Sequence, residues 1–156
     1  MNKTLARFAL SAALAAAALP CFAQLRGTVV SIQDGDTLEV LVNKTPVRVR
    51  LSQIDAPERR QAFGTRARQA LADQVFQEEV EIVVEGNDRY GRTLGRVIHQ
   101  GRDINIEMVQ LGMAWAYDRY VTDVQVQIAE QRARAARRGL WRDEDPVPPW
   151  QFRRKK

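Results

Sequence analysis

Three short segments of this sequence concentrate carboxylate and guanidinium side chains in a pattern that suits chemistry on a phosphate ester. They read Gln-Asp-Gly-Asp-Thr at 33–37, Arg-Leu-Ser-Gln-Ile-Asp-Ala-Pro-Glu at 50–58 and Asp-Arg-Tyr-Gly-Arg at 88–92. The three acids and two arginines of interest are Asp36, Asp55, Glu58, Arg50 and Arg92. Aspartate supplies hard oxygen ligands for Ca²⁺, arginine can grip a phosphate with two N–H groups, and a further glutamate can accept a water proton. Together these groups are suited to cutting a phosphodiester.

Each of these residues also has a simpler interpretation. Asp36 and Asp55 lie at turn-like positions, where aspartate is common for conformational reasons alone. Arg50 and Arg92, taken singly, would be solvated surface charges. Asp34 is assigned no chemistry, because Asp-Gly predicts a two-residue hairpin turn. The joint occurrence of the five groups in a strand, turn and strand context favours the chemical interpretation.

Residues 1–23 have the composition of a secretory signal peptide. A positive start precedes an apolar, alanine-rich run over 8–19, and Ala23 lies at the expected cleavage position. The run is too short to span a bilayer comfortably, so we expect cleavage after Ala23 and a secreted or periplasmic protein with no membrane contact. A lipid anchor on Cys21 is the alternative, although Pro20 directly before it fits poorly.

Removal of this leader narrows the possible chemistry. The net charge falls from +5 to +3, because Lys3 and Arg7 leave and no acid leaves with them. This mildly basic balance suits a polyanionic partner without demanding one. The only cysteine leaves as well, and His99 is the only histidine. A zinc cluster and a serine or cysteine triad are therefore disfavoured, and carboxylate, guanidinium and metal chemistry remain.

The hydrophobic pattern predicts an α+β fold. Five segments have the composition or alternation of strands: 25–32, 37–42, 47–51, 80–85 and 93–99. Helical spacing predicts helices over 65–76 and 104–111, and a third that starts at a capping box of Thr122 and Gln125 and stops at Gly139. Five strands in meander order with a helix after the third suggest a five-stranded OB-type barrel. Arg50 would project away from its core.

The barrel and its three helices are expected to form one domain over 24–143. Residues 144–156 are rich in proline and basic residues and are expected to be a flexible tail. Four arginines recur on the third predicted helix: Arg132, Arg134, Arg137 and Arg138. They indicate a solvated helix face, which could also attract nucleic acid.

The motifs resemble those of the staphylococcal nuclease family, of the secreted thermonuclease type. The matching segments are Asp34–Thr37, Arg50–Glu58 and Asp88–Arg92, with weaker support from Asn105, 110–114 and 139–141. The resemblance extends from about Gly27 to Trp141, and the spaced set is far more specific than any one piece. It implies an OB-type barrel flanked by three helices and a Ca²⁺-dependent nuclease.

The resemblance also implies a role for each motif residue. Two carboxylates and one backbone carbonyl would hold Ca²⁺: Asp36, Asp55 and Ala56. The phosphate-binding arginines would be Arg50 and Arg92, and the general base would be Glu58. The bond to the 5′ oxygen would break, leaving 3′-phosphate products. The segment Arg59–Gly64 is shorter than the mobile loop beside the site of the best-known secreted relative, which leaves the balance of internal and end-first cleavage open.

Substrate contacts are less clear from the sequence. Tyr90, Tyr117 and Tyr120 could stack on bases, and the resemblance places a tyrosine near Tyr117 at the nucleotide pocket. The alternative is that these rings cover the barrel or support the helices. We expect a monomer acting on DNA and RNA, with single-stranded or frayed regions preferred, because such a groove contacts backbone and stacked bases. The alternative function is a catalytically inactive OB module that binds nucleic acid or protein.

Overall fold

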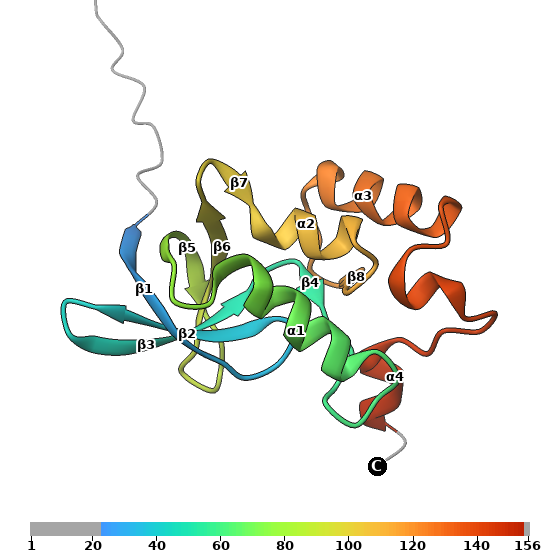
Figure 1. Ribbon diagram of the computed structural model, residues 1–156, viewed down its shortest axis with the longest axis horizontal. Helices are drawn as coiled ribbons and strands as arrows, with labels where there is room; N and C mark the ends of the chain where they lie inside the picture. The colour runs from blue at the N-terminus through green and yellow to red at the C-terminus, as the bar shows by residue number, and fades with distance from the viewer. Residues whose placement is uncertain (1–22, 155–156) are drawn as a thin grey trace, which may run out of the picture.

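Five long strands close into a barrel in the computed structural model, which describes residues 23–154 (Figure 1). The predicted signal peptide, apart from Ala23, lies outside the described residues. The barrel strands are β1 (Gln24–Ile32), β2 (Thr37–Val42), β3 (Thr45–Leu51), β5 (Glu79–Asn87) and β6 (Thr93–His99). Three short strands accompany them: β4 (Ile54–Asp55), β7 (Arg102–Asp103) and β8 (Trp115–Ala116). The expected α+β class and five-stranded OB-type barrel are confirmed.

Strand β1 allows the barrel to close. Its residues 24–28 pair with β5 and its residues 28–32 pair with β2, both antiparallel. The order β3-β2-β1-β5-β6 is completed by a parallel pairing of β3 with β6, which places Val49 opposite Thr93. The expected meander order is therefore wrong. Helix α1 (Gly64–Val75) separates β3 from β5 along the chain. Strand β5 then pairs with β1, which is long enough to pair with two strands.

Alternate residues of the strands fill the barrel, as the period of two predicts. The fully buried strand residues include Val29, Leu38, Val40, Val49, Ile82 and Val97. Helix α1 contributes Ala67, Leu71 and Val75 to this core, and α2 (Ile104–Gln110) contributes Ile104 and Met108. Burial of one large apolar side chain stabilises the fold by about 1.5–3 kcal/mol. The loops at the site are thus carried by a well-packed scaffold.

The two hairpin turns of the first three strands differ from expectation. Asn43 and Lys44, between β2 and β3, both have positive φ, as a two-residue hairpin turn requires. By contrast, β1 and β2 are joined by the four residues 33–36, and Gly35 is not among the residues with positive φ. Gly35 is needed for space instead, because a Cβ there would lie 2.6 Å from the Ala67 Cβ and 2.8 Å from the Ala56 Cβ.

The helices beyond the barrel also depart from prediction. Helix α3 (Val124–Ala135) is capped by Asp123, whose side chain accepts a hydrogen bond from Gln125 N at 2.8 Å, and not by Thr122. The short helix η1 (Gly139–Arg142) follows it. Within the segment expected to be a flexible tail, residues Pro149–Arg154 form a fourth helix, α4. This helix contacts the body of the molecule, as described below.

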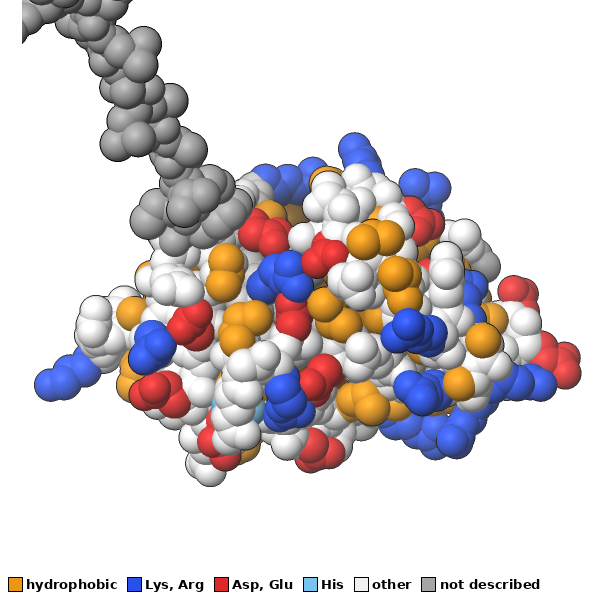
Figure 2. All heavy atoms as spheres, turned by 90° about the horizontal axis from the view of Figure 1, so that it is seen from above, with side chains coloured by type: hydrophobic (Ala, Val, Ile, Leu, Met, Phe, Trp, Pro, Cys, Tyr) orange, Lys and Arg blue, Asp and Glu red, His pale blue; other side chains and the backbone are white. Residues whose placement is uncertain are grey.

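A second, smaller cluster of buried residues lies beside the barrel core. Its members are Trp115, Ala133, Leu140 and Trp141, with Phe63 and Trp150 packed against them. In residues 23–154, none of the helices has the length and apolar character needed to cross a membrane. Figure 2 shows many Lys and Arg side chains toward the right of the face in view, whereas most Asp and Glu side chains lie toward its left and middle.

Candidate active site

Strand pairing brings Asp36, Arg50 and Asp55 together. Thr37 is the register partner of Arg50 in the β2–β3 pair, and Leu51 N donates to the Asp36 carbonyl at 2.8 Å. The Arg50 guanidinium lies between the two carboxylates, with Nε 3.2 Å from Asp36 Oδ1 and Nη2 2.9 Å from Asp55 Oδ1. Its Nη1 donates to the carbonyls of Leu51 and Ile54 at 2.7 and 2.9 Å. Arg50 leaves the apolar core as predicted, yet its side chain is only 12% exposed.

The two aspartates are buried in a pocket rich in negative charge. Asp36 and Asp55 are 5% and 1% exposed. Burial is the main cause that raises the pKa of Asp55, and the nearby charge of Asp36 adds to it, against the opposing effect of Arg153 and Arg50. Burial and the Asp36 charge also raise the pKa of Asp34 to about 7. The pocket therefore disfavours the ionised forms of Asp34 and Asp55.

The pocket provides some, but not all, of the oxygen ligands that a hard divalent cation needs. Asp36 and Asp55 provide carboxylate oxygens, and the backbone of Ala56 lies beside them, because Ala56 N donates to Asp36 Oδ2 at 2.6 Å. A cation would relieve the excess charge of the buried acids, and Ca²⁺ accepts irregular shells completed by water and substrate oxygens. Within the described part of the chain, no group of three or more His, Cys, Asp or Glu side chains is arranged to hold a metal.

Arg92 lies at the rim of the same pocket, held by Asp88 in the β5–β6 turn. Asp88 Oδ2 accepts from Arg92 Nε at 2.7 Å, and its Oδ1 accepts from the backbone N–H groups of Tyr90 and Arg92 at 2.8 and 3.0 Å. Partial burial acts in the opposite direction, but these hydrogen bonds lower the pKa of Asp88. Arg92 Nη1 lies 3.5 Å from Thr37 Oγ1, and that hydroxyl donates to Asp36 Oδ1 at 3.1 Å.

Glu58 begins the short loop that precedes α1. Its backbone N–H donates to Gln61 Oε1 at 3.1 Å, and Gln61 N donates back to the Glu58 carbonyl at 2.8 Å. Gly64 closes the loop, since a Cβ there would lie 2.0 Å from the Glu58 carbonyl oxygen. The Glu58 side chain is 35% exposed and directed to the same pocket, as its shared contact with Arg153 shows.

Arg153 is a member of this site that was not predicted from the sequence. Its Nη2 lies 2.7 Å from Asp55 Oδ2 and its Nη1 lies 2.8 Å from Glu58 Oε1. These ion pairs raise the pKa of Arg153, although partial burial works against them. Residues 149–154 are aromatic and basic, which is compatible with a docked segment. Their proline-rich surroundings predict a flexible tail instead.

The three candidate tyrosines lie at different positions. The β4–β8 pair sets Asp55 opposite Trp115, and Tyr117 N donates to the Gln53 carbonyl at 2.9 Å, so Tyr117 lies opposite Gln53, two residues along this pair from Asp55. Tyr120 packs edge-on against Tyr117, with ring centroids 4.9 Å apart, and is 56% exposed. Tyr90, which is 69% exposed, lies in the β5–β6 turn, with the Arg92 guanidinium 5.7 Å from its ring.

Comparison with known proteins agrees with this geometry. A family model described as "Staphylococcal nuclease homologue" matches residues 48–143. The chain belongs to the staphylococcal nuclease family. It is 51% identical over 147 residues to a protein of Shigella flexneri named "Micrococcal nuclease", covering 87% of this chain and 84% of that protein. It is 51% identical over 159 residues to "Protein ParB" of Escherichia coli, covering 95% and 90% of the two chains.

A third relative is named "Uncharacterized endonuclease", from Haemophilus influenzae, and is 48% identical over 128 residues, covering 81% of this chain and 71% of that protein. The matched family region includes Arg50, Asp55, Glu58 and Arg92, whereas Asp36 and the whole of α4 lie outside it. As a member of the staphylococcal nuclease family, the protein is a nuclease, a hydrolase of phosphodiester bonds.

Proposed function

We propose that the protein is a Ca²⁺-dependent nuclease that hydrolyses DNA and RNA at the pocket formed by Asp36, Asp55, Glu58, Arg50 and Arg92. The observation that carries this proposal is the convergence of these groups: one guanidinium bridges both buried aspartates, a second guanidinium reaches the hydroxyl bound to Asp36, and Glu58 shares a partner with Asp55. The aspartates alone could be explained as turn residues, whereas the combination of acids and arginines in one pocket is suited to binding a phosphate.

In this proposal Asp36, Asp55 and the Ala56 carbonyl hold the cation, with water and substrate oxygens completing the shell. When bound, the cation would neutralise phosphate charge and so lower the barrier to attack by an anionic or polarised nucleophile. The raised pKa of Asp55, caused mainly by burial, supports the assignment, because a cation would stabilise the ionised carboxylate.

The two arginines stabilise the charge that grows on the phosphate oxygens in the pentacovalent state. Arg50 is fixed by both aspartates and two carbonyls before substrate arrives, so little reorganisation accompanies the reaction. Arg92 is more exposed, and Asp88 orients its guanidinium. Arginine suits both positions because its planar, permanently charged guanidinium can be held by protein oxygens through some N–H groups and still offer another to a phosphate oxygen.

Glu58 accepts or orients the proton of the attacking water in this proposal. Its carboxylate is partly exposed and so accessible to solvent, unlike those of the two aspartates. We infer that the bond to the 5′ oxygen breaks, leaving 3′-phosphate ends. Tyr117 and, at the rim, Tyr90 and Tyr120 offer rings on which unpaired bases can stack, which favours single-stranded or frayed substrates. We also propose that the enzyme acts as a monomer.

Export to the periplasm or the medium is part of the same proposal, with cleavage of the leader after Ala23. The support is the composition of residues 1–23. Mass spectrometry of the protein from its culture fractions should find a chain beginning at Gln24, and a chain retaining residues 1–23 in the exported fraction would contradict this part.

The function is tested by incubating the mature protein with single-stranded DNA, duplex DNA and RNA under three conditions: Ca²⁺, chelator, and Ca²⁺ with Glu58→Gln. Degradation is expected only with Ca²⁺ and the unaltered protein, fastest on single strands. Equal degradation in all three conditions would discard the mechanism. The alternative, an inactive nucleic-acid or protein-binding module, would retain DNA without shortening it.

A further inference from the structure

Helix α4 lies across the mouth of the active-site pocket. Arg153 contacts both Asp55 oxygens, at 2.7 Å to Oδ2 and 3.3 Å to Oδ1, and also reaches Glu58 at 2.8 Å. It thus binds one proposed ligand of the cation and the proposed general base at the same time. The Arg153 side chain is 40% exposed, whereas Asp55 is almost fully buried, so the guanidinium enters the pocket from its solvent side.

The same helix covers the candidate base-stacking ring. Trp150 lies parallel to Tyr117, with ring centroids 5.3 Å apart and an interplanar angle of 9°, and packs edge-on against Trp115 at 5.6 Å. The segment before α4 is attached through Gln61, whose Nε2 donates to the Val147 carbonyl.

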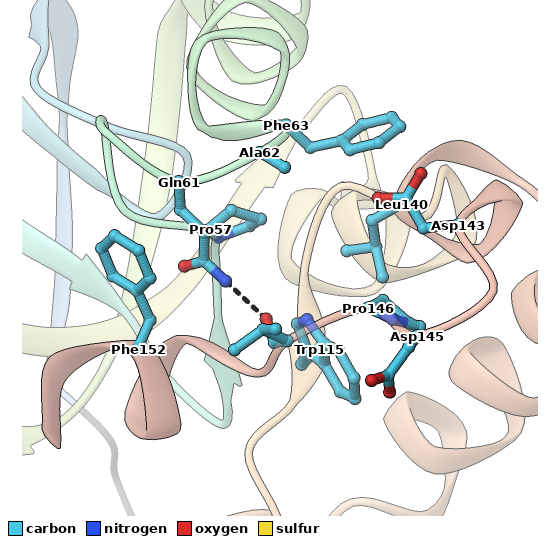
Figure 3. Close-up of a pocket in the computed structure, with 11 residues that line it drawn as sticks. Pro57, Gln61, Ala62, Phe63, Trp115, Leu140, Asp143, Asp145, Pro146 and Phe152 are labelled. Atoms are coloured by element: carbon cyan, nitrogen blue, oxygen red, sulfur yellow. Dashed lines mark hydrogen bonds between the residues drawn. The ribbon is translucent and has the colours of Figure 1, made fainter. Parts of the chain in front are cut away.

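This docking leaves a pocket of about 210 Å³ between the loop that follows Glu58 and the C-terminal segment. Figure 3 shows the residues that line it. Its walls include Pro57 and Gln61 from the loop side and Val147 and Phe152 from the C-terminal side. Most of the connecting residues 143–148 are exposed. The C-terminal segment thus rests on the site through a few side chains, without joining the barrel core.

The contacts of α4 resemble those that a bound cation and a bound nucleotide would make. Arg153 supplies positive charge to Asp55, and Trp150 stacks a flat ring on Tyr117. We propose that α4 is a self-inhibitory cover, with Arg153 in place of the cation's charge and Trp150 in place of a base, and that Ca²⁺ and nucleic acid displace it. This inference rests on the proposed function, because it assigns Asp55 to the cation and Tyr117 to the substrate.

Displacement has to break the packing of Trp150 on Tyr117 and Trp115 as well as the ion pairs of Arg153. A helix of six residues is too short to be stable apart from these contacts. The pair with Glu58 is partly exposed and stabilises weakly, whereas buried Asp55 can lose Arg153 only when another cation replaces its charge. A cation bound to Asp55 would repel the guanidinium, so the two positive charges compete for the same oxygens. A tethered competitor of this kind raises the Ca²⁺ and substrate concentrations that the enzyme requires without abolishing activity.

The opposing model is that Arg153 stays in place during catalysis and acts as a third phosphate-binding arginine. The two models predict opposite effects of Arg153→Gln, and Arg154→Gln is the matched control, because Arg154 is an exposed arginine on the same helix. All variants should be studied in the full mature chain.

Ca²⁺ binding without nucleic acid is measured by calorimetry and tryptophan fluorescence. We expect Arg153→Gln to bind Ca²⁺ about tenfold more tightly, because the guanidinium no longer competes with the cation for Asp55. Arg154→Gln should bind like the unaltered protein. Ca²⁺ should change the fluorescence of the unaltered protein, and Trp150→Phe should remove most of this change. Equal or weaker Ca²⁺ binding by Arg153→Gln would overturn the proposal.

A second measurement uses substrate. Trp150→Ala should lower the KM for single-stranded DNA several-fold with kcat little changed, because a competing ring has been removed from Tyr117. A fall in kcat for Arg153→Gln at saturating Ca²⁺ would support the third-arginine model and contradict the cover. If the unaltered protein binds no Ca²⁺ and cuts nothing, the proposed function itself fails; if it does both and Arg153→Gln matches it, only the cover fails.

Discussion

At the scale of single residues, Arg50 and Arg92 carry the same charge but are held in different ways. Arg50 is buried between two aspartates and two carbonyls, whereas the Arg92 side chain is 27% exposed and paired with Asp88 alone among the carboxylates of the described chain. Removing one partner of a buried ionic group leaves the others without compensation. The two arginines should therefore differ in what their loss does to folding.

Arg50→Lys should lower both activity and the free energy of unfolding, the latter by about 3 kcal/mol, since lysine cannot replace the forked contacts. Arg92→Lys should lower kcat/KM by about a hundredfold and change the free energy of unfolding by less than about 0.5 kcal/mol. Urea unfolding and initial rates measure both. Arg48→Lys, an exposed position on β3, is the control. Equal destabilisation by the Arg50 and Arg92 substitutions would contradict the difference in their environments.

Asp88 should act as a positioning residue for Arg92. Its lowered pKa means that the folded turn binds the Asp88 proton less tightly than the unfolded chain does. Its contribution is therefore present above the unfolded pKa, near 3.8, and is lost as the pH falls through the lower folded pKa.

The Arg92 Nε–H resonance should accordingly stay in its bonded position until the pH falls below the usual aspartate range. In Asp88→Asn that resonance should be displaced already at neutral pH, and KM should rise about tenfold, because the charge-assisted bond is gone. Asp73→Asn, at an exposed position of α1 where Asp73 bonds only with Gln69 among the contacts described, serves as control. An unchanged resonance in Asp88→Asn would refute this role.

At the scale of elements, the packing of α1 against the loop 33–36 sets the position of Asp36. Gly35→Ala would force its new methyl group against Ala67 and Ala56. We expect a loss of about 1–3 kcal/mol in the free energy of unfolding and a larger proportional loss of activity, because overpacking here displaces the site loop. The double variant Gly35→Ala with Ala67→Gly should recover part of the activity lost by the single variant. Strict additivity of the two substitutions would show that this contact does not position the loop.

Helix α3 and strand β8 are joined by a buried carboxylate. Glu130 accepts from Ala116 N at 3.1 Å and lies 3.4 Å from Arg134. Burial raises the pKa of Glu130, Arg134 lowers it in part, and the charge of Asp118 adds to the increase. The folded state thus binds this proton more tightly than the unfolded state, so stability falls as the pH rises from the unfolded pKa, near 4.5, to the folded one.

Glu130→Gln keeps an acceptor for Ala116 N and removes that titration. The free energy of unfolding of the variant, relative to the unaltered protein, should therefore rise between about pH 4 and pH 7. Chemical denaturation at a series of pH values measures this difference. Parallel stability curves for the two proteins would show that Glu130 does not carry the expected penalty.

The elements themselves were largely predictable, because their signals are local. A β-branched composition identified β2, and the alternation of Val47, Val49 and Leu51 identified β3. The helical spacing of Ala67 and Leu71 identified α1 within one residue at each end. The pairing of β1 with β5 was not predictable, since it depends on contacts between segments distant in sequence. Similarly, the need for glycine at position 35 comes from α1, and no local turn preference reveals it.

At the scale of the whole molecule, the motif residues could be selected from sequence but their partners could not. Chemistry and spacing singled out Asp36, Asp55 and Arg50, and the barrel brings them within ion-pair distance. The placement of Arg153 depends on how α4 docks after the exposed connection 143–148, which no periodic pattern specifies. A proline-rich composition indicates lack of regular structure in isolation, and here tertiary contacts with Tyr117 and Glu58 override it.

The central claim is that one pocket gathers a cation, two arginines and a glutamate around a single phosphate. It is tested most directly by a crystal structure of Glu58→Gln with Ca²⁺ and a short single-stranded DNA. We expect Ca²⁺ on the carboxylates of Asp36 and Asp55, one phosphate on Arg50 and Arg92, and a water between that phosphate and position 58. A cation bound elsewhere, or a phosphate that contacts neither arginine, would contradict the account.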